Sequence, residues 1–237
     1  MFVILKLRNL EYFINERQIL KAINFSWDKG ESIAFIGGNG AGKSTLLKII
    51  SLLSQPSKGK LSLGKEISRN NWKSNLGVVF PDNFLHDSLT ALENLHFYQQ
   101  AYGKVDKLLI EIILNKVQLN NVKDEFVGTF SKGMKQRLSI ARALVHQPEF
   151  LILDEPFDGL DLKSKVIIEG ILKEHKTSGY GYILVSHDVK QAFNLCERII
   201  LLHEGEILVD KKGSQMSVSA FLNKYQLLLE RNKNEFL

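Results

Sequence analysis

The sequence lacks several features that would place it in a specialised class of protein. Its 237 residues include a single cysteine, Cys196, so an intrachain disulfide is impossible and a reducing compartment is expected. No apolar run approaches the roughly 18 residues that a membrane-spanning helix needs. The opening stretch, MFVILKLRNL, has no basic leader and no cleavage site, which argues against a signal peptide. We therefore expect an ordinary globular chain without a membrane span.

Dense runs of one charge are also missing. The formal net charge is +5, and a basic balance of this kind suits nucleic acid, acidic lipid or a nucleotide. The lysines and arginines are scattered along the chain, however, as on a solvated surface. Charge alone therefore selects no partner.

Apolar patterns alternate between strand-like and helical segments. Strand patterns occupy residues 3–10, 19–27, 31–36, 75–80, 150–154 and 182–186, and QPSKGK is expected to be a turn. Helical spacing occupies 89–119 with a break near Gly103, and 133–146, 162–176, 188–197 and 215–231. RIILLHEGEILV is typical of a hairpin around Glu204 and Gly205. This order predicts one α/β domain over residues 1–237, with a mostly parallel sheet and an inserted helical subdomain at about 83–147.

A glycine-rich segment, GGNGAGKS, follows a predicted strand, opens a predicted helix and matches the phosphate-loop pattern G-x-x-x-x-G-K-[ST] in full. Its residues, with the threonine that follows, are Gly37, Gly38, Asn39, Gly40, Ala41, Gly42, Lys43, Ser44 and Thr45. Glycines let the backbone N–H groups turn towards phosphate oxygens, and the helix N-terminus adds its positive dipole. We expect Lys43 to reach the β- and γ-phosphates, Ser44 to bind Mg²⁺ and Thr45 to hold the α-phosphate. A glycine-rich turn without a ligand is the alternative.

A second segment, FLILDEPFDGLD, leads an apolar strand directly into two adjacent carboxylates, Asp154 and Glu155. In nucleotidases with such a loop, the first carboxylate after this strand holds magnesium. We assign that role to Asp154, and we expect Glu155 to orient or deprotonate the attacking water. A surface turn, the alternative for paired acids, fits poorly after a buried strand.

Three further segments follow in one order: FSKGMKQRLSIARAL at 130–144, DGLD at 158–161 and LVSHD at 184–188. With the phosphate loop and the DE pair they resemble the ATP-binding subunits of ABC transporters, over essentially residues 3–210. A phosphate loop alone indicates only a superfamily, whereas a signature-like segment between the loop and the DE pair indicates this family. The resemblance implies a P-loop ATPase core, an N-terminal antiparallel β subdomain and the inserted helical subdomain.

The resemblance also implies roles for single residues. FSKGM is similar to the family signature LSGGQ, and it matches at Ser131 and Gly133. In the family two subunits pair head to tail, and each ATP lies between one chain's phosphate loop and the other's signature. His187 matches the switch histidine that contacts the γ-phosphate, although an isolated histidine there would be taken as structural. Asp161 matches the acidic residue that couples the two sites.

The chain departs from the family pattern near the signature and after residues 75–80. Lys132 replaces a signature glycine and Met134 replaces its glutamine. Pro81 stands where the family has a glutamine that senses magnesium, and proline offers neither a polar side chain nor an N–H. Asp82 is the nearest oxygen donor, and we assign it to the metal, with a loop-capping role as the alternative.

The aromatic residue that stacks on adenine in the family is also displaced. Ungapped alignment places Ile14 there, with Tyr12 and Phe13 beside it. We take Phe13 as the stacking residue.

By this resemblance the chain hydrolyses ATP with Mg²⁺ and drives the export of a substrate through a separate integral membrane subunit. The resemblance also implies a second ATPase subunit, identical or homologous, and a peripheral position on the cytoplasmic face of the membrane, without nucleic acid. A soluble family member acting on nucleic acid or ribosomes is the alternative. The segment between Lys43 and Ser131 lacks the sustained heptads of DNA-repair relatives, and the chain holds one ATPase unit where translation factors hold two. A regulator that does not hydrolyse is also disfavoured, because Glu155 and His187 are both present.

Overall fold

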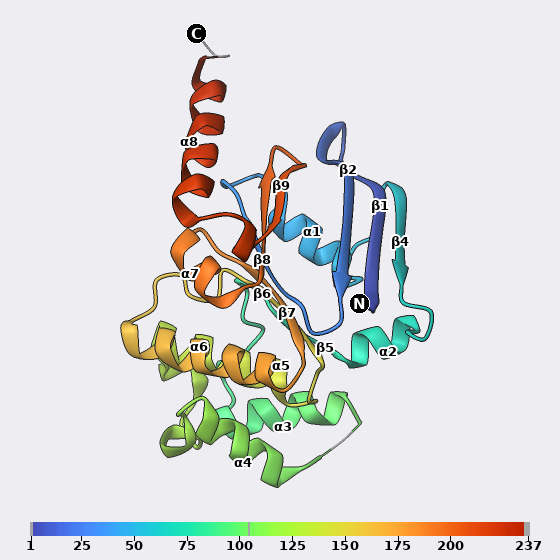
Figure 1. The fold of residues 1–237 in the computed structure, drawn as a ribbon. Coiled ribbons are helices and arrows are strands. Elements are labelled where there is room, and N and C mark those ends of the chain that lie inside the picture. The colour runs from blue at the N-terminus through green and yellow to red at the C-terminus, as the bar shows by residue number, and fades with distance from the viewer. Residues whose placement is uncertain (1, 104, 235–237) are drawn as a thin grey trace.

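The computed structural model describes residues 2–103 and 105–234, and two sheets organise them (Figure 1). The smaller sheet is antiparallel, with the order β2-β1-β4. Its strands are β1 (Val3–Ile14), β2 (Arg17–Asp28) and β4 (Lys58–Leu63). The N-terminal antiparallel sheet implied by the resemblance is therefore present.

The larger sheet carries the order β5-β6-β7-β3-β8-β9. Its strands are β3 (Ser32–Ile36), β5 (Leu76–Val79), β6 (Phe150–Asp154), β7 (Gly181–Val185), β8 (Arg198–His203) and β9 (Glu206–Lys212). The first five strands in that order run parallel, and β9 pairs antiparallel with β8 as the predicted hairpin. Every residue of β3, β6 and β7 is buried, as expected of parallel strands covered on both faces.

Helices cover the large sheet and extend from it. They are α1 (Lys43–Ile50), α2 (Arg69–Ser74), α3 (Ala91–Ala101), α4 (Lys107–Lys116), α5 (Lys132–Leu144), α6 (Leu162–Thr177), α7 (Val189–Leu195) and α8 (Val218–Asn234), with 3₁₀ turns at Asn120–Val122, Val127–Thr129 and Gly213–Gln215. Helices α3 and α4 pack on α5 at the end of the molecule opposite α8 (Figure 1). All three lie within the segment 83–147 that we predict as an inserted subdomain.

The hydrophobic core divides along the two faces of the large sheet. In β3, Ala34 and Ile36 face one cluster, which the helices α3 to α7 complete. Ile33 and Phe35 face the other cluster, which the antiparallel sheet and α1 complete. This alternation follows from the period of two in a strand. The central sheet is therefore held rigidly between two apolar layers, and its strand ends are fixed in space.

The sequence pattern predicts neither β4 nor α2. The residues of α2, RNNWKS, include few strong helix formers. Trp72 is fully buried, stacks on Phe150 at 5.3 Å, contacts the edge of Trp27 at 5.9 Å and donates through Nε1 to the Ile50 carbonyl at 2.9 Å. Tertiary packing around this tryptophan therefore stabilises α2 where local propensity does not.

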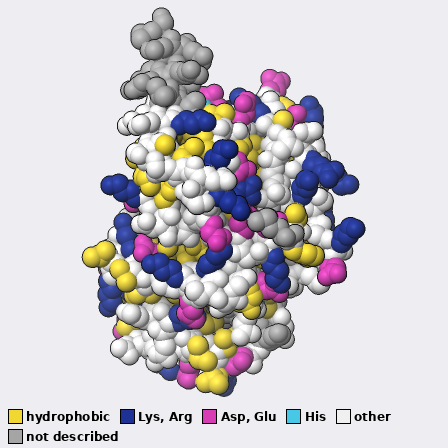
Figure 2. All heavy atoms as spheres, in the orientation of Figure 1, with side chains coloured by type: hydrophobic (Ala, Val, Ile, Leu, Met, Phe, Trp, Pro, Cys, Tyr) yellow, Lys and Arg dark blue, Asp and Glu magenta, His cyan; other side chains and the backbone are white. Residues whose placement is uncertain are grey.

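The surface in Figure 2 shows lysine and arginine side chains spread among neutral and acidic ones. This agrees with the scattered basic residues of the sequence. Within the described residues, we find no helix with the length and apolar character of a membrane span.

Candidate functional site

The glycine-rich segment forms the turn between β3 and α1. Gly42 adopts a left-handed φ of 99°, and a Cβ there would lie 2.7 Å from Leu20 Cδ2. Gly37 packs equally tightly, since its Cβ would lie 2.1 Å from the Leu202 carbonyl oxygen. Neither position accepts a side chain without displacing its neighbours. The turn is thus rich in glycine and leads directly into the N-terminus of α1.

Lys43, the first residue of α1, folds back over this turn. Its Nζ donates to the carbonyl oxygens of Gly37 at 2.8 Å and Gly38 at 2.9 Å. Burial lowers the pKa of the lysine, and the charges of Glu155 and Asp154 act against that shift. The ammonium group is therefore held inside the loop by hydrogen bonds to two neutral carbonyl oxygens.

Asp154 ends β6 and is 2% exposed. Burial raises the pKa of its carboxyl group; a hydrogen bond with the Ser44 hydroxyl lowers it, and the nearby Glu155 charge raises it further. Within residues 2–103 and 105–234, Asp154 Oδ2 has no hydrogen-bond partner although it is buried. A buried carboxylate oxygen without a partner suits a cation that arrives from outside the chain.

Glu155 and His187 meet at the ends of neighbouring strands. Glu155 follows β6 with a left-handed φ of 51°, and its N–H donates to the Val185 carbonyl of β7 at 3.1 Å. His187 Nδ1 lies 2.8 Å from Glu155 Oε2. A non-glycine residue at positive φ is uncommon and marks a position that its surroundings enforce. The backbone hydrogen bond to β7 therefore fixes Glu155 at a position from which its side chain reaches His187.

Two adjoining clefts open over these residues. The first, of about 370 Å³, is lined by the turn 39–45, Asp154 and Glu155, and its outer wall is Ile14, Arg17 and Ile19. The second, of about 560 Å³, is lined by Lys132, Gln136, Asp158 and His187. Asn39, Pro81 and Glu155 line both. The structure therefore brings the phosphate-loop residues, Asp154, Glu155 and His187 to one edge of the large sheet.

The signature-like residues form a separate group at the start of α5. Ser131 is the N-cap of α5 and accepts from the Met134 N–H at 3.2 Å. A Cβ on Gly133 would lie 2.6 Å from Ser164 Oγ and 3.6 Å from Asp161 Oδ1. Asp161 caps α6, and hydrogen bonds from Ser164 lower the pKa of its carboxyl group. Ser131, Gly133 and Asp161 thus lie at one helix junction, and none of them lines the phosphate-loop cleft.

Lys132 crosses this junction towards the loop that follows Glu155. Its Nζ lies 3.4 Å from Asp158 Oδ2, and a Cβ on Gly159 would lie 2.4 Å from the same nitrogen. Both partners of this ion pair are largely exposed, so it contributes little to stability. Lys132 nevertheless lines the cleft that holds His187.

Phe13 and Asp82, which we assign to adenine and to the metal, do not line either cleft. Phe13 is absent from the lining, and its ring lies 5.4 Å from Lys58 Nζ instead, while Ile14 lines the first cleft. An irregular register between Tyr12 and Phe13 sets which side chain faces inward. Asp82 is exposed and lines neither cleft, although the adjacent Pro81 lines both. The geometry therefore gives no support to adenine stacking by Phe13 or to metal binding by Asp82.

Arg17 and Ile19 are site residues that the sequence reasoning missed. Both come from the start of β2, and both line the cleft with the phosphate loop. A guanidinium beside a phosphate cradle suits an anionic ligand. The available signal was a basic residue at the β1–β2 turn, which is common on any surface.

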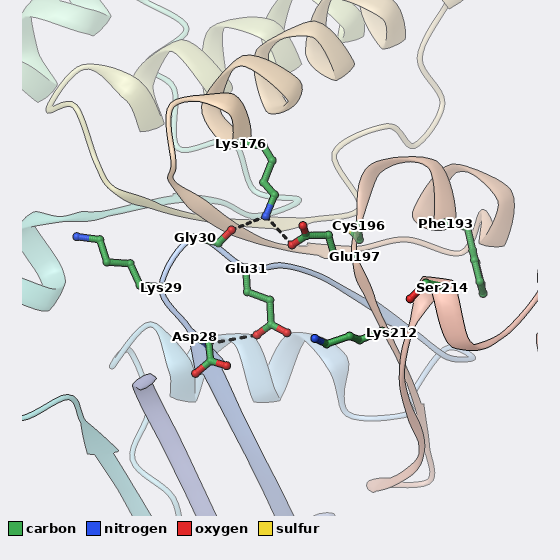
Figure 3. Close-up of a pocket in the computed structure, with 11 residues that line it drawn as sticks. Asp28, Lys29, Gly30, Glu31, Lys176, Phe193, Cys196, Glu197, Lys212 and Ser214 are labelled. Atoms are coloured by element: carbon green, nitrogen blue, oxygen red, sulfur yellow. Dashed lines mark hydrogen bonds and ion pairs between the residues drawn. The ribbon is translucent and has the colours of Figure 1, made fainter. Parts of the chain in front are cut away.

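A further cleft, of about 550 Å³, lies at the opposite end of the strands (Figure 3). Lys176 of α6 reaches both the Gly30 carbonyl and Glu197 there. Glu31 pairs with Arg198 at 3.3 Å. Ligands of open α/β sheets bind at the carboxyl ends of the strands, whereas these charges sit at the amino ends and neutralise one another. This cleft is therefore part of the scaffold.

No cluster of three or more His, Cys, Asp or Glu side chains that would hold a metal occurs in the described part of the chain. A cation at the carboxyl edge would therefore need oxygens beyond these acids. The Ser44 hydroxyl beside Asp154 is one, and ligand phosphates and water are the others.

Comparisons with known proteins agree on one family. Residues 20–158 match the family model described as ABC transporter. The lantibiotic transport ATP-binding protein SrtF of Streptococcus pyogenes is 35% identical over 232 residues, which cover 97% of this chain and 100% of SrtF.

Solved structures show the same fold. An ATP-binding subunit of an ABC transporter superposes with a TM-score of 0.79 at 30% identity, covering 88% of this chain and 90% of that one. A dimeric, post-hydrolysis ATP-binding cassette bound to ADP and Pi superposes with a TM-score of 0.77 at 28% identity, covering 88% of this chain and 98% of that one.

Proposed function

The chain belongs to the ABC transporter family, and on this premise we propose that its carboxyl-edge residues hydrolyse ATP to drive translocation through a separate membrane-spanning partner. The chain is an ATP-binding ATPase subunit of the transport type. One observation carries the assignment of its site: Glu155 contacts His187 at 2.8 Å, beside buried Asp154 and the phosphate loop.

The phosphate loop binds the triphosphate in this proposal. Backbone N–H groups of the turn and the N-terminus of α1 face the phosphates, and Lys43 leaves the Gly37 and Gly38 carbonyls to contact the β- and γ-phosphates. Thr45 holds the α-phosphate. Arg17 adds positive charge at the outer wall of the cleft.

Ser44 and Asp154 would hold Mg²⁺ in this site. The partnerless, buried Oδ2 of Asp154 and the adjacent Ser44 hydroxyl are hard oxygen donors of the kind that this cation prefers. The bound ion supplies positive charge that offsets the charge of the phosphates. Its arrival would also remove the cost of burying an ionised Asp154.

Glu155 and His187 carry the hydrolytic step. Glu155 Oε1, which has no partner among the described residues, orients the attacking water and accepts its proton. Glu155 Oε2 is held by His187 Nδ1, so the carboxylate cannot rotate freely. The second ring nitrogen of His187, Nε2, remains to contact the γ-phosphate.

The complete site requires a second ATPase subunit. Ser131, Gly133 and Asp161 gather at the α5–α6 junction and do not line the phosphate-loop cleft of their own chain. Pairing two chains head to tail would place one chain's junction over the other's phosphate loop. A structural relative of this chain is a dimeric cassette with bound ADP and Pi, which supports this arrangement.

The membrane partner would be an integral transport subunit, with this chain on its cytoplasmic side. The relative SrtF is named for lantibiotic transport, which supports a lantibiotic-like cargo, and we propose export as the direction. The partner, rather than this chain, would select the cargo.

An association experiment tests the composite site. Glu155→Gln should retain ATP and convert the chain from monomer to dimer when ATP and Mg²⁺ are added, as measured by sedimentation velocity. Glu111→Gln is the matched control, because Glu111 lies on α4 in an exposed ion pair with Lys123. It should hydrolyse ATP normally and show no lasting dimer.

A Glu155→Gln protein that stays monomeric at every concentration would contradict a homodimer. Adding a homologous ATPase subunit from the same source then decides between a heterodimer and no composite site. Stimulation of ATP hydrolysis by a co-reconstituted membrane subunit would support the transport role, and its absence would count against that partner.

A further inference from the structure

The C-terminal helix α8 is anchored beside the carboxyl edge, where the parallel strands of the large sheet end. Ser217 caps it by accepting from the Ala220 N–H at 3.2 Å, and Phe221 in its first turn is fully buried. The Phe221 ring packs against Phe193 of α7 with the centroids 5.7 Å apart. Helix α7 begins two residues after His187. The start of α8 is therefore fixed to the element that follows the switch histidine.

Tyr225 lies one turn further along α8, on the same face as Phe221. Positions four apart share a helix face, and the two ring centroids are 6.5 Å apart. A methyl group placed on Gly38 would lie 3.9 Å from Tyr225 Oη, which puts the phenol hydroxyl beside the phosphate loop. In Figure 1, α8 rises from the α7 side of the molecule. The helix thus packs on α7 and lies beside the phosphate loop.

The Tyr225 hydroxyl has an unused hydrogen-bonding capacity. Among the described residues it has no hydrogen-bond partner, and a phenol is a proton donor at neutral pH. Burial raises its pKa further. Its neighbour Gly38 is fully occupied in this structure. The Gly38 carbonyl accepts from Lys43 Nζ at 2.9 Å and from the Ala41 N–H at 3.2 Å.

Nucleotide binding would remove one of these two hydrogen bonds to the Gly38 carbonyl. When Lys43 turns to the phosphates, the Gly38 carbonyl loses its charged donor within a turn that is closed by tight packing at Gly37 and Gly42. The half-buried carbonyl keeps the Ala41 N–H but loses one of its two hydrogen bonds, and a second donor at the same place would recover that bond. Tyr225 provides a hydroxyl at that place.

We propose that Tyr225 is a positioning residue for the phosphate loop, and that its hydroxyl donates to the Gly38 carbonyl once Lys43 has moved to the nucleotide. The proposal rests on the proposed role of Lys43. Because α8 also packs on α7, the same helix would hold the phosphate loop in register with His187. Tyr225 would therefore tune ATP affinity without touching the nucleotide.

The first test removes only the hydroxyl. Tyr225→Phe in the full chain should weaken binding of a fluorescent ATP analogue by about 3- to 10-fold, the loss expected for one neutral hydrogen bond. The maximal turnover rate should stay close to that of the parent, so the effect appears in KM. Tyr180→Phe is the matched control, since Tyr180 is 38% exposed and lines a cleft with His175 at the other edge of the sheet. It should leave affinity unchanged.

The second test separates positioning from general packing. In a Lys43→Met background the Gly38 carbonyl has lost its lysine donor before nucleotide binds and keeps only the Ala41 N–H, so Tyr225 can donate to it in both states. Tyr225→Phe should then have almost no effect on the remaining affinity. An equal loss in both backgrounds, or no loss in the parent, would overturn the proposal. Lys43→Met alone tests the phosphate role: unchanged ATP affinity there would refute that role and the proposal together.

Discussion

The two ends of the parallel strands differ in whether their charged side chains are paired with opposite charges. At the carboxyl edge, Lys43 is buried on neutral carbonyls and Asp154 keeps one oxygen without a partner. At the amino edge, Lys176 pairs with Glu197, and Arg198 pairs with both Glu31 and Asp210. Unpaired buried charge is costly, and an oppositely charged partner offsets part of that cost. The carboxyl edge is therefore arranged for a ligand, and the amino edge for stability.

The largest expected effect is at the carboxyl edge. Glu155→Gln should lower ATP turnover by about 10²–10⁴-fold, because the amide cannot accept the water proton, while ATP still binds. Steady-state hydrolysis and nucleotide binding are measured together. Glu197→Gln at the amino edge is the control and should leave turnover near the parent level. If both variants lost activity equally, the division between the two edges would fail.

Acid should lower the stability of the fold through two histidines near the amino edge. Burial lowers the pKa of His146 and of His175 to about 4. The unfolded chain takes up these protons near the ordinary value of about 6.5, so it binds more protons than the folded chain between the two values. The free energy of unfolding should therefore fall as pH drops from about 6.5 to about 4, by up to ~1.4 kcal/mol per pH unit for each histidine.

His146→Gln isolates one of these histidines. Its Nε2 lies 3.2 Å from the Leu76 carbonyl at the start of β5, and glutamine keeps an N–H donor without the titration. Urea unfolding between pH 4 and 7 should give a shallower slope in the variant. Adding His175→Gln should flatten it further. An unchanged slope in the double variant would show that other groups control acid sensitivity.

A smaller effect is expected from the amino-edge ion pair. Lys176→Met removes the contacts with Glu197 and with the Gly30 carbonyl but keeps the aliphatic stem. Because Glu197 is largely exposed, the loss of stability should be about 1 kcal/mol, read from the urea midpoint. Turnover at a temperature well below unfolding should not change. A large loss of turnover would give this edge a catalytic role that its charges do not indicate.

The smallest effect should come from Asp82. Since Asp82 is exposed and lines neither cleft, Asp82→Ala should leave the magnesium concentration for half-maximal hydrolysis unchanged. Ser44→Ala is the comparison and should raise that concentration. A rise with Asp82→Ala would restore the metal role inferred from the sequence and would extend the carboxyl edge into the loop after Pro81.

The carboxyl edge was the most predictable part of the molecule. β6 covers the predicted strand 150–154, the apolar run FLIL with Asp154 at its end, and the predicted phosphate loop forms the turn between β3 and α1. Parallel strands that are buried on both faces leave one strong signal, an uninterrupted apolar run. The side chains after such runs must gather at one edge, and so Asp154, Glu155 and His187 are found together.

Other positions depended on contacts that no local pattern reveals. β4 carries the sequence KGKLSL and is a strand because it pairs with β1, and α2 is stabilised by the burial of Trp72. Ile14, and not Phe13, faces the cleft, because the pairing register of β1 with β2 is irregular between Tyr12 and Phe13. The alternation of side chains along a strand cannot predict such a shift. Arg17 enters the cleft only because β2 passes the phosphate loop.

The backbone of Glu155 continues the ladder between β6 and β7. Glu155 lies one residue beyond the end of β6, and its N–H donates to the Val185 carbonyl of β7. Amide hydrogens in such a ladder exchange with solvent only when the whole sheet opens. The Glu155 amide should therefore exchange as slowly as those of the buried strands, although its side chain is partly exposed. On heating, this glutamate should keep its alignment until the chain unfolds globally, so that the loss of hydrolysis and the melting of the sheet coincide.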